Sequence, residues 1–409
     1  MRPLRGVSLG ATIALLLPVT AVGQSTPHIS AADSAARAWP TQPAYLWGRA
    51  IAAALAGDDS ATGQALAAYA DLGLGRDLHD DARFTPFLRR PGFAALVARL
   101  DANRAPLRRS RVRARLTDST VWPEGLDYDP HTGRYYLASV RHRTVIELAP
   151  GRAPREILAP GRRDVAAVLG VRVDPAGSVL WVTTSSVRQT GDVARDSAVA
   201  ALLRVRISDG AIERRWDLAP SPRGHTLGDL AVGPTGDVFV TDSDDHALYR
   251  LRAGGDTLEP ITNPLFHSLQ GVAPDPGGSV LYVADYSHGL LHVDLATHIV
   301  TRLDDAPHST SLGCDGIAWD RGAIVAVQNG VSPPRVMQFV LDAAGRRIVR
   351  AELLDRNLPI ADEPTIGVVV GRDFVYVANS QWEKYRDDSS RVPGTRLTGP
   401  VLLAVPLPR

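Results

Sequence analysis

The side chains best suited to chemistry in this sequence stand directly before a glycine that recurs six times. The residues at this position are Glu124, Leu169, Leu227, Gln270, Asp315 and Ile366. If the repeats surround one axis, the two carboxylates come close together and need a cation, a proton or a basic partner. Oxygen ligands favour a hard divalent ion, so we expect Ca²⁺ first, with Mg²⁺, Mn²⁺ or Zn²⁺ as alternatives.

A simpler alternative remains for the two acids. Glu124 and Asp315 would then only accept backbone hydrogen bonds where their strands begin. The single cysteine, Cys314, directly precedes Asp315 on an alternating strand. Its thiol should therefore face into the sheet and be inert, although a nucleophilic role is the competing interpretation.

The pattern around the glycines predicts a closed ring of small sheets. Each glycine opens a short strand with period-2 alternation, and a second apolar strand follows, as in residues 135–139, 238–242 and 281–285. The copies recur at intervals of about 43 to 58 residues, which leaves room for four strands in each. We therefore predict an all-β, six-bladed β-propeller. Residues 401–405 and 111–116 should together complete the sixth blade and close the ring.

Polar residues at the ends of the second strands should lie on the same face as Glu124, because strands alternate up and down within a blade. We expect Asp285, Asn329 and Asn379 to contact a substrate on this face. Inter-blade connections there also carry three candidate proton carriers, His225, His267 and His308, although the pattern favours a solvated loop residue for any one of them. Two long irregular stretches, residues 187–200 and 381–398, should narrow the mouth.

The first 106 residues follow a different pattern. Residues 1–23 have a basic start, an apolar core and small residues spaced like a peptidase site, which predicts a signal peptide and a periplasmic or secreted protein. No later stretch is long and apolar enough to predict a membrane span. Residues 24–106 should be α-helical, and Ala-rich helices joined at Gly57 resemble a tetratricopeptide-type hairpin. This segment could be a packed cap or a docking module for a protein partner, and residues 107–409 should form the propeller.

The composition excludes several classes of function. The chain has 409 residues, of which 44% are hydrophobic and 22% charged, with a formal net charge of +1. Disorder is therefore not expected, and the charge gives no reason to expect nucleic acid as a partner. One cysteine permits neither a disulfide framework nor a thiolate zinc site. The sequence contains no nucleophile elbow, zinc-protease helix or phosphate loop.

The repeat resembles the family of senescence marker protein, gluconolactonase and luciferin-regenerating enzyme. The resemblance covers the chain from about Leu116 onward and rests on Pro-Glu-Gly-Leu at 123–126, Gln-Gly-Val-Ala-Pro-Asp at 270–275 and Cys-Asp-Gly-Ile-Ala at 314–318. The family's catalytic metal is held by a Glu, an Asn and an Asp, and the resemblance carries these roles to Glu124, Gln270 and Asp315. Gln270 is one methylene longer than the family's Asn. The family's substrate-binding Asn of the third blade has no clear equivalent, and Thr226 and Asp229 stand nearest to its position.

The resemblance implies an exported hydrolase that opens a lactone or an ester with a water activated by a divalent metal. Asp315, which the family uses as a base, or one of the loop histidines would take the proton. The alternative is a non-catalytic exported binding protein that recognises a ligand or a protein with its propeller face and helical segment. The three apolar members of the ring and the departure at Gln270 favour this alternative.

Overall fold

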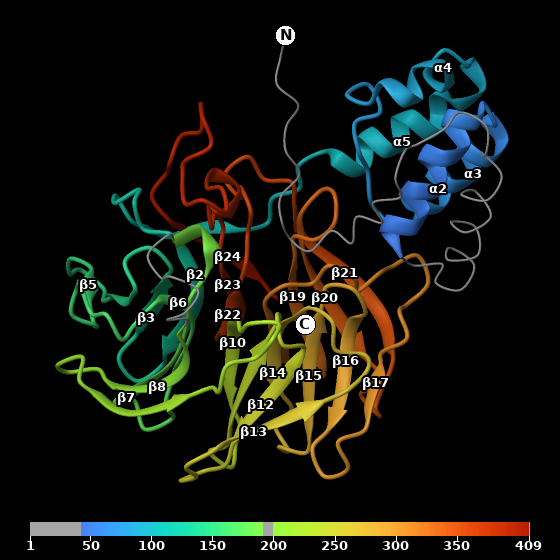
Figure 1. Cartoon of the computed structure of the whole chain (residues 1–409). Coiled ribbons are helices and arrows are strands. Elements are labelled where there is room, and N and C mark those ends of the chain that lie inside the picture. The colour runs from blue at the N-terminus through green and yellow to red at the C-terminus, as the bar shows by residue number, and fades with distance from the viewer. Residues whose placement is uncertain (1–41, 191–198, 409) are drawn as a thin grey trace.

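Six sheets of four antiparallel strands surround one axis, and a helical segment lies beside them (Figure 1). The computed structural model describes residues 42–190 and 199–408. The signal peptide expected at residues 1–23 and much of the stretch 187–200 lie outside the described residues. The prediction of an all-β, six-bladed propeller is confirmed.

The first five blades are simple meanders in chain order. Blade one contains β2 (Pro123–Asp129), β3 (Arg134–Ser139), β4 (Thr144–Leu148) and β5 (Arg155–Glu156); blade two contains β6 (Ala167–Val173), β7 (Val179–Ser185), β8 (Ala200–Arg206) and β9 (Ile212–Asp217); blade three contains β10 (Leu227–Val232), β11 (Val238–Asp242), β12 (Ala247–Leu251) and β13 (Leu258–Thr262). Blade four contains β14 (Leu269–Pro274), β15 (Val280–Asp285), β16 (Gly289–Asp294) and β17 (Val300–Arg302), and blade five contains β18 (Ile317–Asp320), β19 (Ala323–Gln328), β20 (Arg335–Leu341) and β21 (Ile348–Arg356).

Blade six joins the two ends of the propeller. Its strands are β22 (Gly367–Val370), β23 (Asp373–Val377), β24 (Val401–Pro406) and β1 (Arg111–Arg115), in that order from the axis outward. Strand β1 pairs antiparallel with β24, with Val112 opposite Leu403. The predicted closure of the ring is therefore confirmed, and it ties the C-terminal strand to the start of the propeller without a covalent link.

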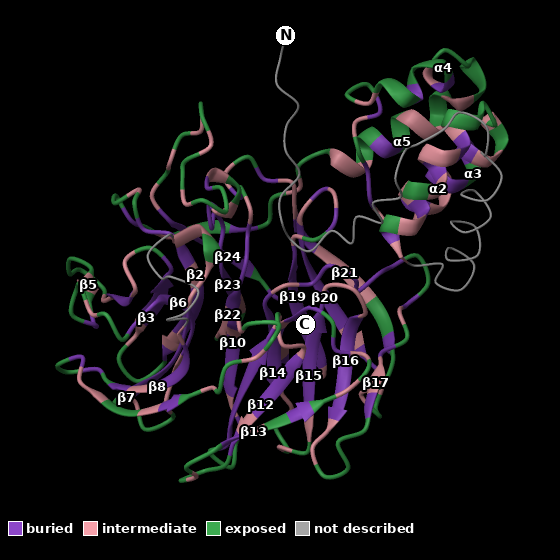
Figure 2. Cartoon of the chain, in the orientation of Figure 1, coloured by how far each residue is buried: buried purple, intermediate pink, exposed green. Residues whose placement is uncertain are grey.

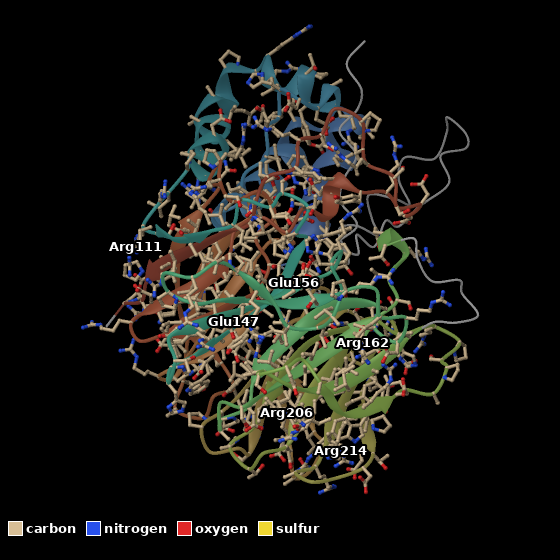
Figure 3. The ribbon with its side chains drawn as sticks, turned by 90° about the vertical axis from the view of Figure 1, so that its left-hand side faces the viewer. Arg111, Glu147, Glu156, Arg162, Arg206 and Arg214 are labelled. Carbon is tan, nitrogen blue, oxygen red and sulfur yellow. The ribbon has the colours of Figure 1, made fainter. Side chains whose placement is uncertain are left out.

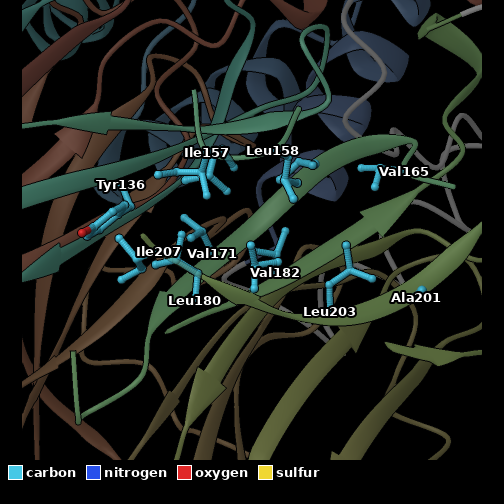
Figure 4. Close-up of a cluster of buried hydrophobic side chains, with 14 residues drawn as sticks. Tyr136, Ile157, Leu158, Val165, Val171, Leu180, Val182, Ala201, Leu203 and Ile207 are labelled. Atoms are coloured by element: carbon cyan, nitrogen blue, oxygen red, sulfur yellow. The ribbon is translucent and has the colours of Figure 1, made fainter. Parts of the chain in front are cut away.

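Apolar side chains hold neighbouring blades together. Between blades one and two, Tyr136 and Val145 of the first pack with Val171, Leu180 and Leu203 of the second (Figure 4). The purple strands of Figure 2 show how nearly continuous this burial is through the propeller. Charged side chains of both signs are spread over its outer side (Figure 3). The strands therefore bury period-2 apolar faces between blades and leave charges to the edges.

The close approach of the next blade's innermost strand explains the recurring glycine at four of the six positions, Gly125, Gly170, Gly271 and Gly316. A Cβ atom on Gly271 would lie 2.6 Å from the carbonyl oxygen of Asp315 and 2.6 Å from the amide nitrogen of Ile317. The amide of Gly271 donates a hydrogen bond to that carbonyl at 3.0 Å. The backbones of blades four and five thus touch where their innermost strands begin. We call this end of the central channel the mouth, and Gln270 and Asp315 are neighbours on its ring.

Replacing Gly271 by alanine should lower the free energy of unfolding by about 1–3 kcal/mol, because the methyl group must push two blades apart. The matched control is Gly228→Ala at the equivalent position of blade three, where the nearest atom to the new Cβ lies 3.5 Å away. Urea denaturation of both variants measures the difference. Equal losses in the two variants would contradict this explanation of the glycine.

The helical segment has its own core. Helices α2 (Pro43–Ala56) and α3 (Asp59–Asp71) meet at Gly57, which caps α2 with a φ of 71°, and α4 (Thr85–Leu88) and α5 (Ala94–Arg104) complete the segment. Leu66, Tyr69 and Phe84 are fully buried in this core. Val331 from blade five belongs to the same cluster, so the segment is packed against the propeller. Within the part of the chain that the structure describes, none of the helices has the length and apolarity to cross a membrane.

Candidate functional site

The two ring carboxylates, Glu124 and Asp315, influence each other at the mouth. Burial raises the pKa of Glu124 well above its ordinary value, and the negative charges of Asp315 and Glu363 raise it further. Burial likewise raises the pKa of Asp315 to about 7, and the charge of Asp229 contributes. Carboxyl groups placed in this way favour a shared proton or a cation over two free negative charges.

Each of the two acids has a fixed hydrogen-bond donor. The indole nitrogen of Trp382 donates to Oε2 of Glu124 at 2.6 Å. The amide nitrogen of Asn329 donates to Oδ2 of Asp315 at 2.6 Å and also to the carbonyl of Pro364. The hydroxyl of Tyr286 donates to the amide oxygen of Asn329 at 2.5 Å, which sets the orientation of that amide. Asn329, expected on the substrate face, is thus placed directly against Asp315.

Glu363 is a third carboxyl group at the mouth. Burial raises the pKa of Glu363 to about 8, and its Oε2 accepts the backbone N–H of Glu383 at 3.2 Å. The backbone of Glu363 has a φ of 67°, which is unusual for a residue with a side chain and is common at functional sites. Glu363 was not expected from the sequence, because it stands at no repeated position. Tyr286 and Trp382 were not expected either, although Trp382 lies in the long stretch expected to narrow the mouth.

The six residues of the ring fall into two groups by their solvent exposure. Glu124, Gln270 and Asp315 are partly exposed, whereas Leu169, Leu227 and Ile366 are buried. The amide nitrogen of Gln270 donates to Oγ of Ser268 at 3.2 Å, which leaves the amide oxygen to face other partners. The oxygen-bearing members therefore line the mouth, and the apolar members pack between blades.

A partly buried arginine, Arg172, interacts with two further acids. Its guanidinium nitrogen lies 2.9 Å from Oδ1 of Asp229. Asp127 accepts the backbone N–H of Val173 at 2.7 Å; burial raises the pKa of Asp127, and the charge of Arg172 offsets this only in part. Asp229, considered as a substrate contact, is therefore an ion-pair partner beneath the mouth. Thr226 instead donates through its hydroxyl to Asp244 at 2.8 Å.

Two of the polar residues expected to contact a substrate, Asp285 and Asn379, instead form hydrogen bonds within the protein. Asp285 accepts the backbone N–H groups of His267, Ser268, Ser287 and His288. Burial raises its pKa, but the His288 side chain and the backbone bonds from Ser268 and His267 together lower it. Asn379 accepts the N–H of Val401 at 2.8 Å and donates to Thr398 and Gly399. Both side chains hold connections in place, which favours a supporting role over substrate contact.

The three candidate histidines lie in different surroundings. His267 is exposed, and its ring lies beside those of His246 and His288, with centroid distances of 5.6 and 4.8 Å. His308 is exposed in its connection. The ring of His225 is bonded to Oδ2 of Asp242 at 2.6 Å and to the Ala219 carbonyl at 2.8 Å. No described contact joins any of the three to Glu124 or Asp315, so their proposed proton-transfer role stays a prediction.

The surroundings of His225 favour its imidazolium form. Both of its ring partners are acceptors, so both ring nitrogens must carry a proton. Burial by itself lowers the pKa of His225, but the hydrogen bond to Asp242, the Ala219 carbonyl and the charge of Asp242 together raise it. His225, Asp242 and Asp245 have ligand atoms within 4.8 Å of one another and could also hold a metal ion. A metal there would have to displace a proton from His225, just as it would from the mouth acids, so this cluster is a second candidate metal site.

The stability contributed by His225 should depend on pH. Because its pKa is higher in the folded state, the contribution is complete below the unfolded value near 6.5 and is lost as pH rises through the folded value. Wild type should exceed His225→Gln by about 1–3 kcal/mol at pH 5.5 and by less at pH 9. Denaturant unfolding at both values tests this, with His131→Gln at an exposed position as the control. A gap that widened with pH would contradict the charged ring.

The mouth has the chemistry of a site for a hard divalent cation. Glu124 and Asp315 offer carboxylate oxygens and Gln270 offers an amide oxygen, whereas the carboxyl group of Glu363 does not form a three-acid cluster with them. Arg172 only partly offsets the charge of Asp229 and Asp127. Burial is the main cause of the raised pKa values of Glu124, Asp315 and Glu363, and neighbouring negative charges add to it. The residues present therefore fit a bound cation. Cys314 is fully buried, and burial raises the pKa of its thiol, as expected for an inert side chain.

The chain has no match by sequence but is similar to solved structures. No protein-family model matches the chain, and a search of curated proteins gave no match. Among solved structures, a luciferin-regenerating enzyme is similar with a TM-score of 0.50 at 16% identity, over 74% of this chain and 95% of that protein. Its fold is that of the gluconolactonase-like propellers. The resemblance read from the repeat is thus confirmed for the fold.

Two further gluconolactonase-like propellers are similar to the chain. One is a gluconolactonase from Xanthomonas campestris, with a TM-score of 0.48 and 16% identity over 74% of this chain and 96% of that one. The other is the calcium-binding protein regucalcin from Agrobacterium tumefaciens, with a TM-score of 0.49 and 16% identity over 73% and 96%.

Proposed function

We propose that this gluconolactonase-like propeller is an exported, metal-dependent hydrolase that opens a lactone or an ester. The observation that carries the proposal is the pair Glu124 and Asp315, two coupled carboxyl groups with raised pKa values at the mouth of the channel. Glu124, Gln270 and Asp315 would hold the cation, with Ca²⁺ as the first candidate. A bound divalent cation supplies a Lewis acid for the substrate carbonyl and for water.

The protein's own residues prepare the site for this reaction. Asn329 holds the Asp315 carboxylate, and Tyr286 keeps the Asn329 amide in the donating orientation. Asp315 is then placed to take the proton of the attacking water. Trp382 donates to Glu124 and brings an apolar ring to the mouth, which excludes bulk water from one side.

Metal content and thermal stability test the proposal. The purified protein should contain a divalent metal, and Ca²⁺ at about 100 times its dissociation constant should stabilise chelator-treated protein by about 2.7 kcal/mol. Because protons compete for Asp315, whose pKa is about 7, the stabilisation should be larger at pH 8 than at pH 6. Glu124→Gln should lose the response. If neither a metal nor a melting shift is found, the proposal fails.

The structure removes one of the arguments for the alternative of a non-catalytic binding protein. Its argument used the apolar ring residues Leu169, Leu227 and Ile366, and all three are buried between blades and unavailable to a ligand. Metal binding without hydrolysis of any member of a lactone and ester panel would favour this alternative. Export rests on residues 1–23 alone, and we propose a periplasmic or secreted location that cell fractionation can test.

A further inference from the structure

The turn between β19 and β20 connects the mouth with the helical segment. On its mouth side, Asn329 donates to the Asp315 carboxylate at 2.6 Å. Three residues later, the carbonyl of Ser332 accepts the Tyr69 hydroxyl at 3.3 Å and the N–H of Gly75 at 3.1 Å. Val331 lies between these points and packs into the core of the helical segment. A single short turn therefore contacts both parts of the molecule.

A buried arginine makes a second connection between the same two parts. Arg335, the first residue of β20, is only 4% exposed. Its guanidinium donates to the carbonyl of Leu72 in the helical segment at 2.9 Å and to the amide oxygen of Gln328 at 2.5 Å. Both acceptors are uncharged, and burial lowers the pKa of Arg335 to about 10. A buried charge without a carboxylate partner is costly for stability, so its presence calls for another explanation.

Gln328 carries this connection on to the strand of Asp315. Its amide nitrogen donates to the carbonyls of Thr310 and Leu312, at 2.8 and 2.6 Å. Leu312 is three residues before Asp315, and the backbone N–H of Asp315 is itself bonded to the carbonyl of Val327. Gln328, whose side chain is bonded to Arg335, therefore holds the segment 310–315 that leads to Asp315.

We propose that the helical segment positions Asp315, and that Arg335 is the positioning residue through which it acts. Two routes converge on Asp315. One runs through Asn329 to its carboxylate, and the other runs through Arg335 and Gln328 to its backbone. Without the contacts of the segment, the connection at residues 310–315 loosens, and the carboxylate loses its alignment with Glu124 and Gln270. The cation-binding consequence rests on the proposed function, whereas the positioning of the backbone does not.

The test compares Arg335→Met with Arg356→Met. Arg356, in β21, also donates to helical-segment carbonyls, those of Ala105 and Ala102 at 2.9 and 3.0 Å, but has no described contact with the approach to Asp315. Calorimetric titration with Ca²⁺, well below the melting temperature, should show affinity about 10-fold weaker in Arg335→Met and within 2-fold of wild type in Arg356→Met. Arg335→Lys should recover part of the affinity.

Hydrogen exchange separates this proposal from the proposed function. In protein freed of cation, amides of residues 310–316 should exchange faster in Arg335→Met and at the wild-type rate in Arg356→Met. If wild type binds no cation, this exchange pattern alone decides the proposal. Unchanged exchange, or unchanged affinity in a protein that binds Ca²⁺, would overturn it. Should Arg335→Met not fold, Gln328→Met removes the same connection and is judged by the same criteria.

Discussion

Replacing Asp315 by asparagine should reduce hydrolysis at least about 1,000-fold and, at the same time, stabilise the metal-free protein at pH 8. The loss follows because Asp315 is both a cation ligand and the base in the proposed reaction. The gain in stability follows because its pKa is raised to about 7 in the folded state. At pH 8, folding must keep a buried carboxylate charged in the field of Asp229, and the asparagine removes that cost.

The sign of the pH effect makes this prediction specific. A carboxyl group whose pKa is raised by folding destabilises the protein most at pH values above the folded pKa, and the penalty shrinks as pH falls from there and disappears below the unfolded pKa, near 3.8 for Asp315. The advantage of Asp315→Asn should therefore be about 1–3 kcal/mol at pH 8 and clearly smaller at pH 5. Lactone hydrolysis in a pH-stat and denaturant unfolding measure the two effects. Asp256→Asn, a surface control whose side chain is 85% exposed, should change neither.

Retained hydrolysis in Asp315→Asn would exclude the proposed mechanism. If Asp315→Asn lost both hydrolysis and stability at pH 8, Asp315 would mainly hold its strand in place. This is the simpler interpretation, in which its carboxylate accepts backbone hydrogen bonds.

Shortening Leu402 and Leu403 to alanine together should remove about 4–10 kcal/mol of stability, which is most of what a domain usually has. These neighbours in β24 are both fully buried, but they face opposite sides of blade six. Leu402 packs with Leu126 and Leu137 of blade one, and Leu403 packs with Val325 and Leu354 of blade five. The double variant therefore weakens both interfaces of the blade that closes the ring.

Strand β1 provides the matched control. Val112 pairs with Leu403 in the sheet, but its side chain is 36% exposed. Val112→Ala should cost less than about 0.5 kcal/mol. Guanidinium unfolding monitored by tryptophan fluorescence measures all three variants. If Val112→Ala were as damaging as either leucine change, closure would depend on the outer strand pairing rather than on burial in β24.

The sequence was most informative where the fold repeats itself. The recurring glycine and the period-2 strands predicted six blades, and the pairing of 111–116 with 401–405 could be predicted because a ring with an unpaired edge would expose backbone groups. These features are local or periodic, so they can be read without knowing which blades touch. The break between the first two helices at Gly57 could be predicted for the same reason, since a glycine with positive φ ends a helix.

The site was only partly predictable. Glu124, Gln270 and Asp315 stand at a repeated position, and the repeat itself drew attention to them. Glu363, Tyr286 and Trp382 stand at positions with no equivalent in the other blades, so no pattern identified them. Whether a histidine near a ring glycine faces the mouth or a neighbouring carboxylate depends on the path of its loop, and His225 is bonded to Asp242 instead.

By itself, the sequence determined the six-bladed architecture, its closure and the ring of residues that could carry chemistry, because strand periodicity and turn chemistry act over a few residues. The tertiary structure decided the electrostatics. Burial, together with the charges of neighbouring carboxylates, raises the pKa values of Glu124, Asp315 and Glu363. It also showed that the helical segment contacts the turn carrying Asn329, a contact between parts of the chain more than 250 residues apart that no local pattern records.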